Sequence, residues 1–204
     1  MQPQPLPRAT PYVTYTLIVA CVVGFILQGN SPGPMLEYGA LWPIDEYFQP
    51  WQVLTYSFLH GSPTHLIFNM LGVYMFGAEL ERLFGAQRFS ALYFASVITA
   101  AIAQLMFSAY IHSATPTIGA SGGLFGLLLA FAMIFPKRTI VPLIPPIPMP
   151  AWLFVTLYAG LELYLGVTGT MEGIAHFAHL GGLIGAFLLL THWRRQHTRT
   201  LRQR

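Results

Sequence analysis

Residues 119–126 read Gly119-Ala120-Ser121-Gly122-Gly123-Leu124-Phe125-Gly126, a run of mostly small residues that opens an apolar segment. A serine here has an ordinary explanation, because serine is a favoured helix N-cap and glycines let membrane helices pack closely. A second run of the same character, Ala178-His179-Leu180-Gly181-Gly182-Leu183-Ile184-Gly185, carries a histidine. Two helices with glycine faces can bring their backbones close enough for Ser121 and His179 to touch. The two stretches therefore predict a tightly packed helix pair with a hydroxyl beside an imidazole.

The composition places the chain in a membrane. Of its 204 residues, 54% are hydrophobic and only 8% are charged, which is unusual for a soluble domain. The formal net charge of +3 does not indicate nucleic-acid binding, because every basic residue lies at the end of an apolar segment, as the positive-inside rule describes. Cys21 is the single cysteine, so an internal disulfide is excluded. We expect an integral membrane protein that contacts the lipid bilayer and has no nucleic-acid partner.

The apolar runs predict an all-α membrane protein, a bundle of six transmembrane helices. They cover approximately residues 12–27, 64–83, 89–110, 121–135, 151–167 and 173–193. The first run could also be a cleaved signal peptide, because Ile18-Val19-Ala20-Cys21 is similar to a lipoprotein cleavage box, but it stays apolar as far as Leu27. We expect three parts, a cytosolic N-terminal segment (1–10), a membrane domain (11–193) and a basic cytosolic tail (194–204).

The distribution of charges and prolines predicts the topology. An even number of spans places both termini on one side, and the arginine-rich ends make that side the cytosol. Residues 30–50 are aromatic and acidic without Lys or Arg, which suits an outer loop, whereas the proline-rich residues 139–150 cannot be helical and predict a stiff cytosolic linker. The chain has no long soluble extension and no Arg/Ser-rich transit segment, which favours a multi-pass protein of the bacterial inner membrane.

Four polar residues fall at a similar depth in three of the expected spans. Counted from the basic residue that closes each span, helical rise places them about 24 Å (Ser121), 22 Å (His179), 20 Å (Asn69) and 26 Å (His65) above the cytosolic edge. All four lie in the outer half of a hydrocarbon core that is about 30 Å thick. Polar groups persist at such depth where they face a bundle interior or a water-filled cavity. They could be unrelated interhelical hydrogen bonds, but their common level predicts one site.

These residue types suit acyl transfer. Ser121 needs a base within hydrogen-bond reach, and His179 is the candidate. The only acids near the outer half of the last two spans are Glu162 and Glu172, and neither has a spacing that argues for contact with His179, so Glu162 is interpreted as capping or lining the cavity. His65 and Asn69 are four apart on one helical face and can point at the same spot as oxyanion donors, with the Ser121 backbone N–H as a third.

The motifs together resemble the rhomboid intramembrane serine proteases. They are Gly-Ala-Ser-Gly at 119–122, Ala-His-Leu-Gly-Gly at 178–182, Glu81-Arg82 followed by Gly85, and the run from Trp51 to His60-Gly-Ser-Pro-Thr-His65-Leu-Ile-Phe-Asn69. The resemblance implies a six-helix rhomboid-like bundle with a Ser121–His179 dyad and an oxyanion site that includes His65 and Asn69. It also implies supporting roles for Gly119, Phe125 and His60, a partly membrane-embedded first loop, and neither cofactor nor metal.

Two residues depart from the pattern of many members of that family. Gln52 stands where Arg follows the tryptophan, which puts the hydrogen bonding of the loop in doubt. Phe125 stands where many members have a Tyr stacked beneath the histidine, so an aromatic face is kept and a hydroxyl is lost.

The leading functional hypothesis is a serine endopeptidase that hydrolyses peptide bonds near the outer end of transmembrane protein substrates. One alternative is an inactive rhomboid-like protein that binds transmembrane clients, against which the presence of both Ser121 and His179 argues. Another is a transporter or metal-handling protein that uses its histidines. His176 and His179 could share a helical face, but no carboxylate or thiol evident in the sequence completes a metal set with them.

Overall fold

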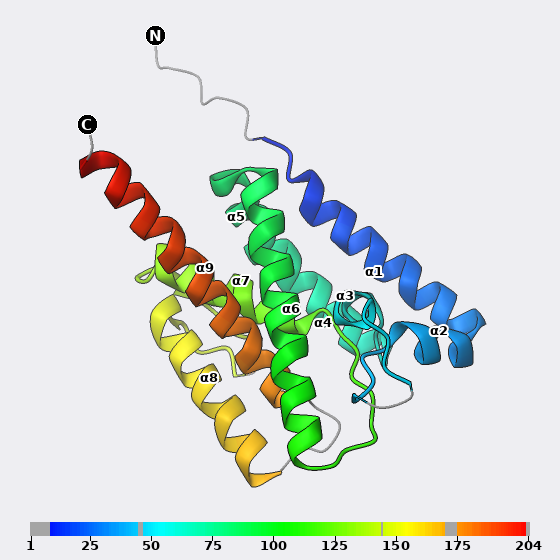
Figure 1. The fold of residues 1–204 in the computed structure, drawn as a ribbon. Helices are drawn as coiled ribbons and strands as arrows, with labels where there is room; N and C mark the ends of the chain where they lie inside the picture. Colours follow the sequence, from blue (N-terminus) through cyan, green and yellow to red (C-terminus); the bar gives the residue numbers. More distant parts are fainter. Residues whose placement is uncertain (1–8, 45–46, 144, 170–174, 203–204) are drawn as a thin grey trace.

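The structure is a computed structural model that describes residues 9–44, 47–143, 145–169 and 175–202. It is mostly helical (Figure 1). In chain order the elements are α1 (Tyr12–Asn30), α2 (Pro32–Gly39), α3 (Gln52–Thr55), the 3₁₀ turn η1 (Tyr56–Phe58), α4 (Pro63–Gly72), the π-helical turn η2 (Val73–Gly77), α5 (Ala78–Phe84), α6 (Ala86–Tyr110), α7 (Ser121–Ile134), β1 (Thr139–Ile140), β2 (Met149–Pro150), α8 (Ala151–Thr168) and α9 (His176–Arg202).

Helices α6, α7 and α9 form the core of the bundle. Helix α6 packs most extensively against α9, which crosses beside it, and both helices also pack against α7, most of whose residues are buried (Figure 1). The buried residues of α6 recur at three- and four-residue spacing, from Phe89 through Leu92, Tyr93, Ser96 and Val97 to Ala100 and Ala101, so that one stripe of the helix faces the core. The start of α1 and the end of α9 lie at the same end of the bundle (Figure 1).

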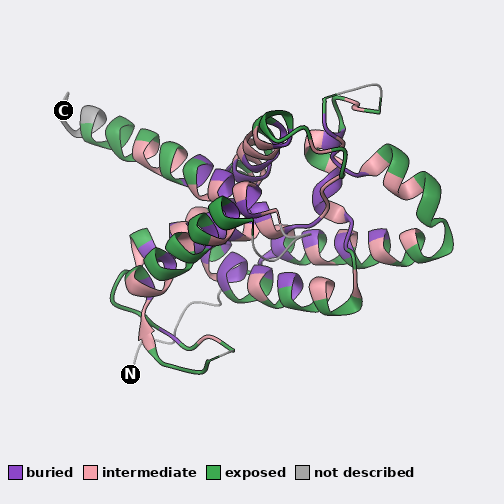
Figure 2. Ribbon diagram, turned by 90° about the horizontal axis from the view of Figure 1, so that it is seen from below, coloured by how far each residue is buried: buried purple, intermediate pink, exposed green. Residues whose placement is uncertain are grey.

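The outer helices present apolar side chains to the surroundings. Buried residues gather in the middle of the molecule and exposed ones line its outer faces (Figure 2). On α1 and α8 many exposed residues are large and apolar, among them Ile26, which is 57% exposed, and Val167, which is 71% exposed. Such surfaces are costly in water and favourable in lipid. The exposed apolar side chains indicate an integral membrane protein.

Three of the described helices are long and apolar enough to cross a membrane, α1, α6 and α8. Helix α7 is apolar but has only 14 residues. The count of six membrane spans therefore remains a prediction. The predicted second span coincides with a helical segment from Pro63 to Phe84 that the π-helical turn η2 divides into α4 and α5, which sequence periodicity did not indicate.

Helix α1 is capped from a distant part of the chain. Its own N-cap residue, Pro11, offers no side-chain hydrogen bond. Instead the buried carboxylate of Glu81 in α5 accepts from the backbone N–H groups of Val13 (2.9 Å) and Thr14 (2.8 Å) and from the Thr14 hydroxyl (2.7 Å). These are the N–H groups that a helix start leaves without an intrahelical partner. Glu81 thereby ties the beginning of α1 to the end of the second helical segment.

The connecting segments follow the sequence expectations only in part, because the segment 30–50, expected as a loop, contains helix α2 (Pro32–Gly39). The described part of the proline-rich segment 139–150 is not helical, and its ends pair as the short antiparallel strands β1 and β2. Helix α9 continues to Arg202 without a break at the predicted boundary between residues 193 and 194. Glu172 and most of the predicted N-terminal segment lie outside the described residues, so the division into three parts remains a prediction.

Candidate active site

Ser121 and His179 are in contact. Ser121 is the first residue of α7, and its Oγ lies 2.8 Å from Nε2 of His179, which stands in the first turns of α9. The serine is partly buried and the histidine is 9% exposed. A serine hydroxyl at hydrogen-bond distance from a histidine nitrogen is the arrangement that activates a nucleophile.

Glycines make this contact possible. A Cβ atom built on Gly182 would lie 2.0 Å from the carbonyl oxygen of Gly122, and one built on Gly122 would lie 2.5 Å from the Cβ of Ala100. On the far side of α9, a Cβ on Gly181 would lie 2.6 Å from the carbonyl oxygen of Thr99 in α6. No larger residue fits at these points with the backbones where they are. The close packing of α9 against α7 and α6 therefore requires glycine at these positions.

Phe125 supports the imidazole from below. Its ring stacks on His179 with centroids 4.3 Å apart and planes inclined by 6°, and it also contacts the ring of Tyr158 of α8, with centroids 5.0 Å apart. Phe125 follows Ser121 by one helical turn, so the helix that presents the hydroxyl also restricts rotation of the base. An aromatic face suffices for this contact, and the hydroxyl of a tyrosine is not needed for it.

His65 and Asn69 occupy one side of α4, as their spacing predicts. A Cβ built on Gly119 would lie 2.9 Å from Nε2 of His65 and 3.7 Å from Oγ of Ser121, so the imidazole and the hydroxyl border the same point. Gly119 has φ +130, a backbone conformation that disfavours side chains. The Asn69 amide donates to the carbonyl of His65 (3.0 Å), and its buried Oδ1 has no hydrogen-bond partner among the described residues.

His60 and Gln52 belong to the segment that precedes α4. The His60 ring is fully buried and meets His65 edge to face at 5.1 Å. Gln52 is also fully buried, and its side chain bonds four backbone groups, those of Glu37, Trp42, Tyr47 and Gln49, at 3.2 to 3.3 Å. The sequence left open whether the loop keeps its hydrogen bonds with Gln52 in place of arginine. It does, because the neutral amide of Gln52 bonds these four backbone groups.

The structure corrects the interpretation of Glu162. No carboxylate was expected near His179, yet Oε2 of the buried Glu162 in α8 lies 2.9 Å from Nδ1 of His179 and 2.6 Å from Nδ1 of His176. Spacing along one helix does not show which residues of a neighbouring helix a side chain meets, which is why the position of Glu162 did not suggest the contact. The available signal was a carboxylate within an apolar span that lacks a basic residue, since such groups are generally functional.

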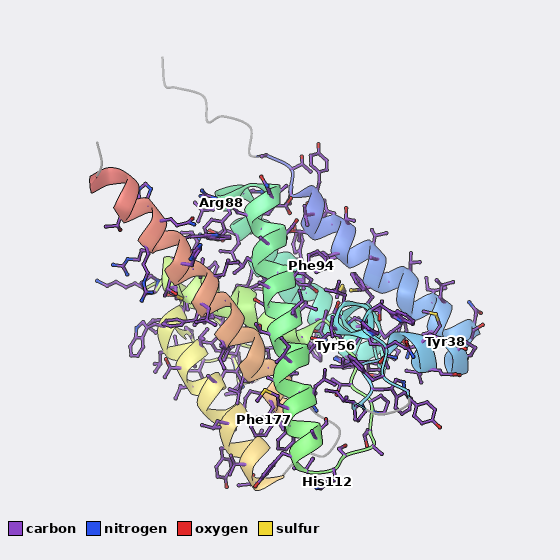
Figure 3. The ribbon with its side chains drawn as sticks, in the orientation of Figure 1. Tyr38, Tyr56, Arg88, Phe94, His112 and Phe177 are labelled. Atoms are coloured by element: carbon purple, nitrogen blue, oxygen red, sulfur yellow. The ribbon has the colours of Figure 1, made fainter. Side chains whose placement is uncertain are left out.

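Packing between the end of α8 and the start of α9 aligns these three side chains. Phe177, next to His176, stacks on Phe107 of α6 with ring centroids 3.9 Å apart. Figure 3 labels Phe177 beside α6. A Cβ built on Gly166 would lie 3.1 Å from the Cβ of His176, so α8 approaches the start of α9 closely at that glycine. Glu162 stands one turn before Gly166 and therefore faces the two histidines.

Glu162, His176 and His179 also form a group whose ligand atoms all lie within 4.8 Å of one another, as a metal site would require. The distances argue against a preformed site. Two ligands of a tetrahedral zinc ion stand about 3.3 Å apart, because each bond is about 2.0–2.1 Å long. The 2.6 Å between Nδ1 of His176 and Oε2 of Glu162 is instead the length of a short direct hydrogen bond.

The sequence matches a known family. The family model of the rhomboid domain matches residues 47–196, and the chain therefore belongs to the rhomboid family. The chain is 32% identical over 139 residues to the rhomboid protease GluP of Bacillus subtilis, covering 67% of this chain and 25% of that protein. It is 34% identical over 140 residues to RHOMBOID-like protein 4 of Arabidopsis thaliana, covering 68% of this chain and 33% of that protein.

A third relative is matched over most of the present chain. The rhomboid protease GlpG of Serratia proteamaculans is 28% identical over 187 residues, which cover 91% of this chain and 63% of that protein. The chain thus spans less than two thirds of the length of each of these relatives.

Proposed function

We propose that this protein is an intramembrane serine protease that hydrolyses peptide bonds of membrane-spanning protein substrates. The observation that carries the proposal is the 2.8 Å contact between Oγ of Ser121 and Nε2 of His179. Membership of a family with relatives named as proteases supports it. An inactive client-binding protein is the alternative, but it has no need of a hydroxyl and an imidazole held at hydrogen-bond distance.

The proposed chemistry is acyl transfer through the serine. Nε2 of His179 takes the hydroxyl proton as Oγ of Ser121 attacks the scissile carbonyl carbon, and the carbonyl electron pair moves onto oxygen. When the intermediate collapses, the C–N bond breaks and Nε2 gives its proton to the departing amine. Water then attacks the acyl carbon as Nε2 takes one of its protons, the bond from that carbon to Oγ of Ser121 breaks, and Nε2 returns the proton to Oγ, which releases the carboxylic acid.

The developing oxyanion needs donors, and three groups near Ser121 are available. As the first residue of α7, Ser121 has a backbone N–H without an intrahelical acceptor. His65 borders the same point across Gly119. The Asn69 amide uses one of its two hydrogens on the His65 carbonyl, which leaves the second hydrogen for an oxyanion. Donors already in place before the reaction stabilise the transition state without reorganisation.

The depth of the nucleophile suggests where the substrate is cut. Ser121 lies about 24 Å above the cytosolic edge of a core about 30 Å thick, so the scissile bond should be near the outer end of the substrate span. A helical substrate must unwind before its carbonyls are accessible, and small or helix-breaking residues lower that cost. Helix α8 packs mainly on α9 and α7. We propose sideways entry from the lipid between α8 and the segment formed by α4 and α5.

The test uses purified protein in detergent or vesicles with a tagged single-span substrate. Ser121→Ala and His179→Ala should each abolish cleavage and fluorophosphonate labelling while the variants keep their thermal unfolding midpoint. Mass spectrometry of the fragments should locate the cut in the outer half of the substrate span. Hydrolysis retained by Ser121→Ala would refute the serine mechanism, and a cut in the cytosolic half would refute the proposed position.

A further inference from the structure

Glu162 is a buried carboxylate that the serine chemistry outlined above does not use. It is 4% exposed, and among the described residues its polar partners are the two imidazoles of His176 and His179. A carboxylate away from water is costly unless it is paired and hydrogen-bonded. The chain could have avoided that cost with any apolar residue, which α8 carries at most of its other positions. We therefore expect the Glu162 carboxylate to contribute to the function of the site.

The two ring nitrogens of His179 face different partners. Nε2 lies 2.8 Å from Oγ of Ser121, and Nδ1 lies 2.9 Å from Oε2 of Glu162. For Nε2 to accept the serine proton, the proton of the neutral ring must be on Nδ1. A carboxylate next to Nδ1 selects that tautomer, because an unprotonated Nδ1 would set a lone pair against a negative charge. Glu162 thus stands where it can decide which nitrogen is the base.

The contact of Glu162 with Nδ1 of His179 is short but not aligned as a hydrogen bond, since Nδ1 has no hydrogen-bond partner among the described residues. Catalytic hydrogen bonds are commonly misaligned without substrate and tighten in the reacting complex. His176 holds the carboxylate in place for that step. Its Nδ1 and Oε2 of Glu162 are 2.6 Å apart, and the stacking of Phe177 on Phe107 holds its backbone.

We propose that Glu162 is a positioning residue for His179, so that the dyad works as a Ser121–His179–Glu162 triad with His176 as the residue that orients the carboxylate. The inference rests on the proposed function. The carboxylate takes no proton in any step. It accepts the Nδ1–H of His179, keeps the ring from rotating, and offsets the positive charge that the ring gains when Nε2 takes the serine proton.

The decisive variant is Glu162→Gln, which keeps the side-chain length and removes the charge. We expect kcat to fall about a hundredfold with KM within a factor of two, because the lost interaction acts on the transition state rather than on substrate binding. The loss should be smaller than the roughly 10⁴-fold loss seen when an aligned triad aspartate becomes asparagine, since the contact here is not aligned. Fluorophosphonate labelling should slow in parallel, and Glu162→Asp should recover part of the rate.

Glu81→Gln is the matched control, because Glu81 is an equally buried carboxylate, 4% exposed, whose hydrogen bonds go to the start of α1 and not to the site residues. It should lower the unfolding midpoint and leave kcat per folded molecule unchanged. A purely structural Glu162 would behave in the same way, and that result would overturn the proposal. His176→Asn, which keeps a donor near the Nδ1 position, should retain most of the rate, whereas His176→Leu should lose about as much as Glu162→Gln.

Two further outcomes separate this inference from its competitors. Wild-type turnover should be unchanged after dialysis against a chelator. A rate that is lost on chelation and restored by zinc would assign the cluster to a metal and overturn the proposal. Wild-type kcat in Glu162→Gln, with Ser121→Ala inactive, would refute the positioning role alone and leave the serine protease intact. Hydrolysis retained by Ser121→Ala would instead remove the function on which the inference rests.

Discussion

Replacing Gly182 by alanine should separate the serine from its base without touching either. A Cβ atom on Gly182 would lie 2.0 Å from the carbonyl oxygen of Gly122, and real Cβ contacts essentially never fall under 3.0 Å. The neighbour is backbone, so it cannot rotate away. Helices α7 and α9 must therefore move apart by about 1 Å. We expect the free energy of unfolding to fall by about 1–3 kcal/mol, which is the usual cost of adding atoms to a filled interior.

That displacement acts directly on the site. Gly122 follows Ser121 in α7, and Gly182 lies three residues after His179 in α9. A misplacement of about 1 Å is enough to cost about a hundredfold in rate. We expect kcat to fall by at least that factor and the unfolding midpoint to fall by several degrees.

The assay combines turnover of a tagged single-span substrate with fluorophosphonate labelling and thermal unfolding of the same preparation. Gly160→Ala on α8 is the control, because no atom lies within 4 Å of a Cβ at that position. It should leave turnover unchanged and stabilise the helix by up to about 1 kcal/mol. Wild-type turnover and stability in Gly182→Ala would show that the glycine contact does not hold the serine and histidine together.

Two further predictions address the oxyanion and the topology. Asn69→Ala and His65→Ala should each lower turnover by about tenfold to a thousandfold, since one oxyanion donor contributes up to about 4 kcal/mol, and wild-type rates in both would remove these residues from the mechanism. In a cysteine-free background, a cysteine at the exposed Ser31 should react with impermeant reagents from outside the cell, and one at the exposed Thr198 only from the cytosol. The reverse labelling pattern would invert every depth given above.

The close approach of α7 and α9 could be predicted from the sequence. Glycines four apart on an apolar helix form a face without side chains, and two such faces can pack closely. The face shared by His65 and Asn69 follows from their spacing in the same way. Gln52 shows the limit of such reasoning, since its four backbone partners come from both sides of a loop and only the folded loop brings them together.

Glu162 could not be placed from the sequence for a different reason. Its position along α8 gives an approximate depth but does not show which neighbouring helix the side chain faces. The side chain reaches His179 because α8 approaches the start of α9 closely at Gly166. Tilt of that kind is set by packing between helices rather than by the pattern within one. The π-helical turn at Val73–Gly77 is similar, because nothing in its residues breaks the helical period.

The cap that Glu81 provides to α1 bears on how the protein is assembled during synthesis. Helix α1 leaves the ribosome before α5, and the acceptor for the N–H groups of Val13 and Thr14 lies 67 residues or more further along the chain. Until that carboxylate arrives, the first turn of α1 must find water or lipid headgroups as hydrogen-bond partners. The hydrogen bonds that cap α1 can therefore form only once the second helical segment has been made, so the start of the first helix reaches its final contacts later than its place in the sequence implies.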